Sequence, residues 1–597
     1  MSRFDSLSPY FERLQDIPAA WLALASALAV VALSAFAYAP LFGEGMILTG
    51  DNLHAWRLFE MHNCISDGQI PCRWAAGLGN GYGLPLFNFY PPLPYYVGDV
   101  LHRLGLSYFN TVDALFIIGL VAAGLSMFLL GRGLWGNLGG IVSAIAYVYA
   151  PYLALDTYMR GALGELWALA IAPAVFWAVY RLITTERARY TFAIALFSAL
   201  LLLSHSLATM ILLPMVAIWA AVLLSTRGRN AWKPALLGSA GALWGLGLAA
   251  FFTLPMLAEG GDVQLESTAE FPFLFQAHFT TVGDLFLERS SDYGFLLEGA
   301  GGSGTPIQIG WFHWALAGLS IPAGLLLFRS GRRTPAIAVL LLAGFFAAGT
   351  FMAISASESV WDTFDALRFL QFPWRYLGLV SLAAAGLAGV WLAVLRERTV
   401  WLRFVVTGLL VGLFVGSGQT FFEPLHRCTV EADRAIPCPG SDAEYFSDGP
   451  YRASEEGSIH DYLPAAVDVI PEPAGLAVFV LGDAGPVTAL NRQSDRLAFE
   501  IDAASSVHVE TAIFDYPAWT VRIDGAAVDH TASERHGLIT FDVPEGEHAV
   551  EVTLGSSGIA RLSNWISLLS WLALAVAIAA MLVVSIKSRR RRASNDS

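Results

Sequence analysis

Charged side chains are scarce in this chain of 597 residues. They make up 14% of it, whereas hydrophobic residues make up 55%. This balance excludes an ordinary soluble protein. The sequence also lacks a P-loop, a G-x-G-x-x-G pattern after a strand and an H-E-x-x-H pattern. Soluble-nucleotide chemistry on the inner side of a membrane therefore finds no support.

Long apolar runs are what the sequence has in abundance. A helix that crosses a membrane needs roughly 20 mostly apolar residues. We predict twelve such helices, near residues 19–42, 110–131, 137–153, 162–183, 190–204, 207–225, 235–257, 309–328, 335–354, 376–395, 400–418 and 562–586. The first run lacks a clear small-residue cleavage site, so we expect a signal anchor rather than a cleaved leader.

The basic residues fall on one side of this twelve-helix map. Short cytoplasmic loops retain Lys and Arg, and the loops in question carry Arg132, Arg181, Arg227, Arg329, Arg396 and Lys587. We therefore expect both termini to be cytoplasmic, with residues 1–18 as a cytoplasmic tail. Residues 43–109 then form the first outer loop, with helical pieces at 52–66 and 93–104.

Negative charge is concentrated between the last two predicted spans. Residues 421–558 hold 24 acidic and 7 basic residues, a net charge of −17, so the rest of the chain sums to +3. Such a block argues for an exported domain and against a nucleic-acid partner. Alternation of apolar and polar residues predicts strands at 497–501, 507–514, 519–524, 538–543 and 549–554.

The predicted architecture is a polytopic α-helical membrane protein with a C-terminal extracytoplasmic β-sandwich domain. The transmembrane domain covers residues 19–418, and the β-rich domain covers residues 419–561. The last transmembrane helix and a basic cytoplasmic tail occupy residues 562–597.

Only four cysteines are present, and they form two local pairs, Cys64 with Cys72 and Cys428 with Cys438. All four lie on the predicted outer side, where an oxidising compartment favours disulfides that pin local loops. Free thiols and a four-Cys metal site are the alternatives, although neither pair has the C-x-x-C spacing of a zinc knuckle.

The first outer loop carries more chemistry than a simple tether needs. Asp51 follows the first span and is placed to meet a substrate from the aqueous side. As a general base it would take the proton from an acceptor hydroxyl while that oxygen attacks an activated anomeric carbon. The alternative is a helix N-cap, because Asp is a favoured cap residue.

Arg160 and Arg375 stand at predicted outer helix ends. A guanidinium group binds phosphate oxygens bidentately, so both residues are candidates for holding a lipid-linked donor phosphate. The alternatives are interfacial snorkelling or a salt bridge, for instance between Arg160 and Glu165.

Further polar and aromatic residues are candidates for the walls of a substrate site. They are His54, Arg57, Arg73, Trp74, Asn88, Tyr90, Glu165 and His205. An aromatic ring such as Trp74 can stack on a sugar or belong to the interfacial belt. A single histidine near a helix end can equally be a satisfied polar residue.

The loop sequence GDNLHAWR, followed by DGQIPCRWAAGLGNGYGLPLFNFYPPLPYY, resembles the first outer loop of a bacterial and archaeal membrane-protein family. Its members are labelled YfhO-like, or 6-pyruvoyl-tetrahydropterin synthase-related. Further similar segments follow in order, namely MRGALGELWALAIAP, LLLSHSLAT, FFTLPMLAE, LQFPWRYLGL, PAWTVRIDG and GLITFDVPEGEHAVEV. The resemblance does not imply pterin chemistry, because nothing here supplies the histidine-ligated zinc of the soluble pterin enzyme.

That family looks like part of the GT-C superfamily of glycosyltransferases. The resemblance implies a multi-pass protein of the bacterial inner membrane that takes a sugar from a polyprenyl-phosphate donor and passes it to an extracytoplasmic acceptor. Asp51 would be the catalytic acid/base position and Arg375 a phosphate contact. Many relatives in the superfamily have an adjacent acidic pair here, whereas Asn52 follows Asp51. No cofactor is therefore assigned, and a divalent ion, Mg²⁺ or Mn²⁺, stays open.

Two other functions fit the same composition. A transporter or flippase for a lipid-linked glycan would have ionisable residues and broken helices at mid-membrane. A non-catalytic scaffold for cell-envelope assembly would use the β-domain as a binding module.

Overall fold

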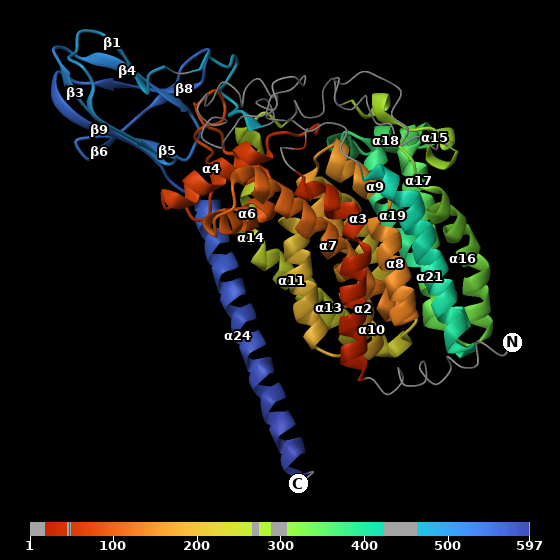
Figure 1. Ribbon diagram of the computed structural model, residues 1–597. Coiled ribbons are helices and arrows are strands. Elements are labelled where there is room, and N and C mark those ends of the chain that lie inside the picture. Colours follow the sequence, from red (N-terminus) through yellow and green to blue (C-terminus); the bar gives the residue numbers. More distant parts are fainter. Residues whose placement is uncertain are drawn as a thin grey trace.

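The computed structural model describes residues 18–43, 47, 49–265, 274–287, 307–422, 462–473 and 475–595. They form a helical bundle, a layer of short helices across one of its faces, and a β-domain above that layer (Figure 1). We call this the outer face.

The second predicted disulfide, between Cys428 and Cys438, lies outside the described residues. Neither Cys428 nor Cys438 belongs to any of the ranges given above, so the structure does not bear on their pairing. The disulfide between Cys428 and Cys438 therefore stays a prediction.

The bundle contains eight single helices that are long and apolar enough to cross a membrane. They are α7 (Tyr108–Trp135), α10 (Leu163–Thr185), α12 (Ser206–Ser225), α16 (Trp311–Arg329), α17 (Arg333–Ala353), the segment Pro373–Glu397 with α19 (Leu377–Ala388) and α20 (Val390–Val394), α21 (Val400–Gly418), and α24 (Gly558–Asn595).

Three further candidate spans are bent, which raises the number in the described residues to as many as eleven. The bends are 43°, 47° and 75°. The helices that meet at them are α2 (Ala19–Leu33) with α3 (Ala35–Tyr38) and η2 (Ala39–Phe42), α8 (Asn137–Val148) with α9 (Pro151–Ala154) and η3 (Leu155–Met159), and α13 (Trp232–Leu248) with α14 (Ala250–Ala258).

The remaining member of the predicted set, at 190–204, forms α11 (Arg189–Leu202). Its 14 residues rise only about 21 Å at about 1.5 Å per residue. A straight helix of that length is shorter than the roughly 30 Å hydrocarbon core. It is outside the count of eleven by length alone, because its end returns to the outer start of α10, where a Cβ at Gly164 would lie 2.8 Å from the Ser204 carbonyl oxygen.

The layer on the outer face consists of the first outer loop. Its helices are α4 (His54–Ser66), α5 (Leu86–Phe89) and α6 (Leu93–Arg103), close to the predicted pieces. A disulfide joins Cys64 to Cys72, as predicted. Further short helices on this face are α15 (Val282–Phe286) and α18 (Glu358–Thr363), together with the 3-10 turns η5 (Gly260–Asp262) and η10 (Pro373–Tyr376).

The β-domain consists of two antiparallel sheets, with strand orders β1-β4-β8-β7 and β2-β3-β9-β5-β6. Its strands are β1 (Val478–Leu481), β2 (Thr488–Gln493), β3 (Arg496–Ala503), β4 (Val507–Phe514), β5 (Trp519–Ile523), β6 (Ala526–Val528), β7 (Thr531–Ala532), β8 (Leu538–Val543) and β9 (Gly546–Leu554). Alternate residues of β3, such as Leu497, Phe499 and Ile501, are buried. Alternation of this kind fills the core between two packed sheets.

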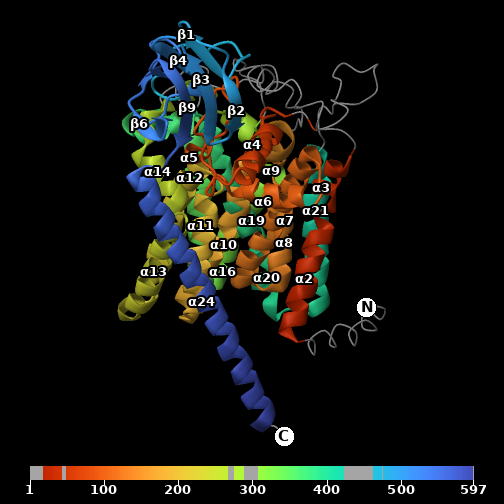
Figure 2. The same ribbon diagram turned by 90° about the vertical axis from the view of Figure 1, so that its left-hand side faces the viewer.

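The β-domain and the first outer loop share one hydrophobic core. Trp74 of the loop packs edge-on against Trp519 with ring centroids 5.3 Å apart. Tyr82 packs on Phe514 at 5.3 Å, and its carbonyl accepts a 3.0 Å hydrogen bond from the Phe514 backbone N–H. The loop is therefore held between the bundle and the β-domain, as Figure 2 shows from the side. The predicted fold class is confirmed.

Candidate functional site

Asp51 lies between the end of the first bent span and α4, on the outer face. Its backbone N–H donates to the Arg160 carbonyl at 2.9 Å, and the Gly50 N–H donates to the Met159 carbonyl at 2.7 Å. These two bonds attach the start of the first outer loop to the turn before α10. They place Asp51 beside the segment that carries Arg160.

The Asp51 carboxylate is held from one side and 30% of the side chain is exposed. Arg57 Nη1 donates to Oδ2 at 2.7 Å, and the Leu53 N–H donates to Oδ1 at 3.3 Å. Arg57 in turn donates to the Tyr90 hydroxyl at 3.2 Å, and its guanidinium carbon lies 4.4 Å from the centre of that ring. Asp51 is not the N-cap of α4, because Leu53 takes that position.

Asp51 is ionised near neutral pH. Burial raises the pKa of its carboxyl, but the positive charge of Arg57, with the hydrogen bonds from Arg57 and Leu53, lowers it below its ordinary value. A carboxylate in this state can accept a proton and cannot donate one. The group is therefore suited to the role of base rather than acid.

His54 is buried beneath Asp51 and both of its ring nitrogens are occupied. Nε2 donates to the carbonyl of Gly161, and Nδ1 accepts from the Tyr95 hydroxyl at 2.8 Å. Burial lowers the pKa of His54, and the Arg57 charge lowers it further. The imidazole is neutral and positions the loop against Gly161, so it has no nitrogen left for a substrate.

A second polar group lies in the same region, and it consists of four charged residues. Arg160 makes an ion pair with Asp156, and Arg160 Nη1 donates to Glu165 Oε2 at 2.9 Å. Arg375 Nε lies 3.5 Å from the same Glu165 oxygen. We call Asp156, Arg160, Glu165 and Arg375 the quartet.

Aromatic rings cover the two arginines of the quartet. The guanidinium carbon of Arg160 lies 4.6 Å from the centre of the Trp374 ring, and that of Arg375 lies 5.0 Å from the Phe372 ring. The salt bridge between Arg160 and Glu165, an alternative that the sequence left open, is present. Both arginines therefore already have acidic partners.

His205 caps the start of α12 next to the quartet. Its Nδ1 accepts the Ala208 backbone N–H at 3.0 Å, so the other ring nitrogen carries the proton. A side-chain carbon added at Gly164, one residue before Glu165, would lie 3.4 Å from the His205 ring. His205 thus forms part of the wall around Glu165.

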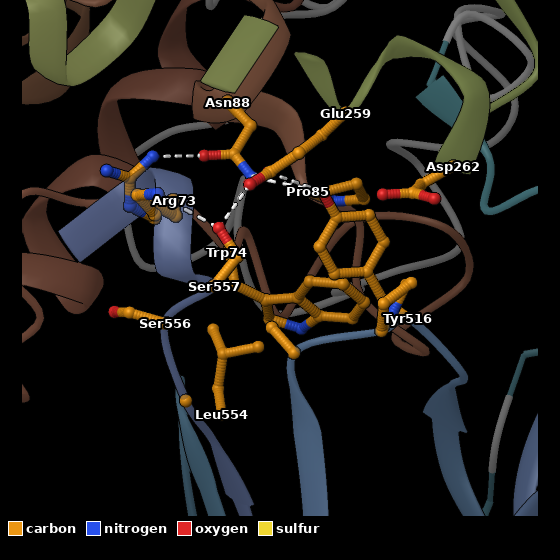
Figure 3. Close-up of a pocket in the computed structure, with 14 residues that line it drawn as sticks. Arg73, Trp74, Pro85, Asn88, Glu259, Asp262, Tyr516, Leu554, Ser556 and Ser557 are labelled. Atoms are coloured by element: carbon orange, nitrogen blue, oxygen red, sulfur yellow. Dashed lines mark hydrogen bonds between the residues drawn. The ribbon is translucent and has the colours of Figure 1, made fainter. Parts of the chain in front are cut away.

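The structure places three other predicted residues in a different group, at the seam with the β-domain (Figure 3). Arg73 donates to Asn88 Oδ1 at 2.5 Å, and Asn88 donates to the Tyr516 hydroxyl at 3.2 Å. Glu259 accepts hydrogen bonds from Tyr516 at 3.1 Å and from Ser557 at 2.5 Å. These residues and Trp74 line a cavity with a volume of about 50 Å³.

Asp51 borders another cavity, of about 30 Å³. The two cavities have no lining residue in common. The structure therefore groups Asp51 with His54, Arg57 and Tyr90, and does not bring Arg73, Trp74 and Asn88 to it. A cavity of this size holds only two or three water molecules, at about 10–15 Å³ each. A sugar would have to approach Asp51 from its exposed side.

The oxygens around Asp51 are not arranged as a metal site. Asn52 Oδ1 accepts the Thr49 N–H at 2.9 Å, and Asp51 Oδ2 accepts from Arg57. In the part of the chain that the structure describes, no group of three His, Cys, Asp or Glu residues could hold a metal ion. The residues present do not fit a divalent ion.

Five residues in these groups were not predicted as site residues, namely Asp156, Tyr152, Tyr95, Glu259 and Tyr516. Asp156 had a usable signal, because a carboxylate within an apolar run is costly unless it is paired. Arg160 stands four residues later, the spacing of an ion pair on a helix. The partners Tyr95 and Tyr516 had no such signal, since they reach their sites only through tertiary packing.

The fold and the site together define a multi-pass membrane protein with a buried ionisable site at its outer face. The sequence matches the family described as "6-pyruvoyl-tetrahydropterin synthase related domain; membrane protein" over residues 87–417, more than half of the chain. The chain belongs to this family. The resemblance predicted from the loop motifs is confirmed to that extent.

Other known proteins are more distantly similar. An uncharacterized protein of Lactococcus lactis subsp. cremoris (strain MG1363) is 25% identical over 209 residues, which is 34% of each chain. The arabinofuranosyltransferase AftD from mycobacteria has a TM-score of 0.45 and 15% identity, covering 72% of this chain and 29% of its own.

Two further solved structures are similar at the same level. The Archaeoglobus fulgidus oligosaccharyltransferase has a TM-score of 0.40 and 12% identity, covering 67% of this chain and 55% of its own. ArnT from Cupriavidus metallidurans, bound to undecaprenyl phosphate, has a TM-score of 0.39 and 16% identity. The match covers 67% of this chain and 64% of the ArnT chain. The chain thus spans about a third of the curated relative and less than two thirds of each of these structures.

Proposed function

We propose that this protein is an integral membrane glycosyltransferase. It transfers a sugar from a polyprenyl-phosphate donor to an extracytoplasmic acceptor, which is a glycan, a lipid or a protein. The outer face then lies on the extracytoplasmic side of the bacterial inner membrane, and both termini lie in the cytoplasm. The β-domain orients the acceptor over the first outer loop.

The observation that carries this proposal is the state of Asp51. Its carboxylate is ionised, oriented by Arg57 and partly exposed at the outer face. It takes the proton from the acceptor hydroxyl while that oxygen attacks the anomeric carbon. The bond between that carbon and the phosphate oxygen breaks, polyprenyl phosphate leaves, and the anomeric configuration is inverted.

Arg160 and Arg375 supply the positive charge for the donor phosphate. They lie in the quartet, and the backbone bond from Asp51 to Arg160 keeps the quartet next to the base. Guanidinium groups stabilise the charge that develops on a phosphate leaving group. Tyr90 and His54 shape the wall near Asp51, the former through Arg57 and the latter through Gly161.

The test is a transfer assay with purified protein in detergent or nanodiscs. The protein is incubated with a panel of polyprenyl-phosphate sugars, and release of polyprenyl phosphate is measured. For the donor that is consumed, we expect Asp51→Asn to lower the rate by about 100-fold to 10,000-fold, the usual contribution of a general base.

Asp67→Asn is the matched control, because Asp67 belongs to the same loop and accepts a 2.7 Å bond from the Ser494 N–H that Asn can also accept. It should keep the wild-type rate. An Asp51→Asn protein that folds and retains full transfer activity would remove Asp51 from the role of base.

A transporter for a lipid-linked glycan is the second candidate, and the three bent spans favour it. Broken helices are a feature of transporters that alternate access. Movement of a fluorescent lipid-linked glycan between the leaflets of proteoliposomes, without any chemical change to it, would support this function over transfer.

A further inference from the structure

The quartet is unusual because it buries four formal charges in one place. Asp156 is 0% exposed, Glu165 2% and Arg375 8%, and the Arg160 side chain is 11% exposed. Two guanidinium and two carboxylate groups sum to zero. Buried charges are tolerated only when they are balanced in this way.

Two polar atoms of the quartet make no hydrogen bond within the described part of the chain. They are Asp156 Oδ2 and Arg375 Nε. The other carboxylate is fully engaged, because Glu165 Oε1 accepts the Tyr152 hydroxyl at 2.6 Å and Oε2 accepts from Arg160. The quartet therefore contains one buried donor that is ion-paired but makes no hydrogen bond, Arg375 Nε, and one buried carboxylate oxygen without a hydrogen-bond partner, Asp156 Oδ2.

This balance changes when an anion enters. A polyprenyl-phosphate sugar is a phosphodiester and carries one negative charge. Bound to Arg160 and Arg375, it would leave the buried group with a net charge of −1. One proton taken up by a carboxylate restores neutrality, and the resulting hydroxyl becomes a hydrogen-bond donor for a phosphate oxygen.

We propose that Asp156 takes up this proton, so that binding of the donor phosphate is coupled to protonation of Asp156. The inference rests on the proposed function, in that it uses the same arginines for the donor. Asp156 is a donor-binding residue here. As a carboxylate it neutralises Arg160 before the donor binds, and as an acid it releases Arg160 to the phosphate.

Five titratable or charged groups face Asp156. Each comes from a segment near Asp156. They are Tyr147 on α8, Tyr152 on α9, Arg160 after η3, Glu165 on α10 and Arg375 on η10. Asp156 sits in η3, a π-helical turn, and such turns recur at functional sites. None of the other acidic or phenolic groups among these combines complete burial with an unpartnered oxygen.

The experiment measures binding of an isoprenyl methyl phosphate of 10 to 20 carbons to the full-length protein in nanodiscs. This phosphodiester keeps a single charge between pH 5.5 and 8.5, so any pH dependence belongs to the protein. Coupling to one proton makes the affinity rise by about tenfold for each pH unit of acidification.

Titration calorimetry in two buffers of different ionisation enthalpy then counts the protons directly. Wild-type protein should take up one proton per probe at pH 7.5. No uptake would overturn the proposal, and so would a failure of the probe to bind at any pH. This measurement needs no variant and is independent of how a variant folds.

Asp156→Asn gives the sharper result. Its quartet has a net charge of +1, so it should bind the probe at pH 8 at least about tenfold more tightly than wild type and with no pH dependence. Weaker binding, or an unchanged pH slope, would show that Asp156 is only structural. Asp99→Asn is the matched control. Asp99 is a buried carboxylate outside the quartet, and its Oδ2 lies 2.8 Å from Arg103 Nε. This variant should keep the wild-type dependence of affinity on pH.

The two proposals fail separately. Asp51→Asn should lose transfer activity and keep both probe binding and proton uptake. If Asp51→Asn is active while proton uptake remains, only the base assignment fails. If uptake is absent while Asp51→Asn is inactive, only the coupling fails.

Discussion

At the scale of single residues, Glu60 shows how burial changes a carboxyl group that no sequence motif marks. It lies on α4 and is 3% exposed. Burial raises the pKa of Glu60 to about 7, in spite of the 2.8 Å hydrogen bond from the Gly77 N–H and the positive charge of Arg492. Glu60 therefore titrates at the junction of the first outer loop and the β-domain.

The sign of its effect on stability follows from the two pKa values. The pKa in the folded state, about 7, exceeds the ordinary value of 4.5. The protonated form thus stabilises the fold fully below pH 4.5, and this contribution is lost as the pH rises to 7. The shift corresponds to at most about 3 kcal/mol.

We predict that Glu60→Gln removes this loss, because glutamine can still accept the Gly77 bond and never ionises. Relative to wild type, the variant should gain up to about 3 kcal/mol at pH 8 and nothing at pH 4.5. Thermal unfolding at the two pH values measures the difference. Glu500→Gln, at an exposed position of β3, should change stability by less than about 0.5 kcal/mol at either pH. A variant that is equally destabilised at both pH values would contradict the prediction.

At the scale of elements, the bent span α8–α9–η3 brings its end against the first outer loop. The chain reverses at Gly161, where φ is +64°. A Cβ atom at this position would clash with Thr49 Oγ1 and lie 3.0 Å from the Asp51 carbonyl oxygen. Glycine is therefore required there both for its backbone angle and for the close approach.

We predict that Gly161→Ala displaces the Asp51 loop and lowers the transfer rate on the order of a hundredfold, the effect of a misplacement of about 1 Å. Gly228→Ala is the matched control. Gly228 has a similar φ of +56° but no atom within 4 Å of an added Cβ. Both variants carry a backbone penalty of roughly 1–2 kcal/mol, which thermal unfolding should show. Only Gly161→Ala also disturbs the contact with Thr49 and Asp51. Equal transfer rates in the two variants would therefore contradict the role of the close approach.

Sequence periodicity located five of the nine strands described in the β-domain and did not mark the bends. The strands predicted at 507–514 and 538–543 coincide with β4 and β8. Every residue of β2 is exposed, so it has no apolar alternation and was missed. Hydropathy likewise records the length of an apolar run but not its direction. The 75° turn between α13 and α14 at Ala249 left no trace in the pattern.

At the scale of the whole molecule, Arg73 joins three parts of the chain. Besides Asn88, it donates to Asn564 of α24 at 2.8 Å and to the Phe251 carbonyl of α14 at 3.2 Å. Figure 1 shows α24 standing apart from most of the bundle, with its upper end under the β-domain. The seam around Arg73 is therefore one of the places where that helix, the loop and the bundle are connected.

We predict that Arg73→Met destabilises the protein by about 2–4 kcal/mol, because it leaves buried amide and carbonyl oxygens without a donor. Thermal unfolding would detect this. Arg522→Met removes an exposed arginine of β5 that donates to the nearby Gly525 carbonyl at 3.1 Å, and it should cost less than about 1 kcal/mol. If the two variants are equally stable, the seam does not hold the parts together.

The candidate site was only partly predictable. Asp51, Arg160 and Arg375 could be named because charged groups at the ends of apolar runs are rare and conspicuous. The pairing of Arg160 with Glu165 was an alternative that the sequence left open, whereas Arg375 meets Glu165 only through a contact across the fold. The prediction that Trp74 and Asn88 share a pocket with Asp51 had no basis beyond nearness in sequence.

What the sequence determined by itself is the composition of each layer. Apolar runs must form helices in a membrane, because an unpaired backbone group there is too costly, and alternating polar and apolar residues must form sheets with one buried face. Which charges neutralise one another was decided only by the tertiary structure. Ion pairing depends on separations of a few ångströms between side chains from different elements, and these separations exist only after the bends at Ser34 and Tyr149 bring the helix ends together.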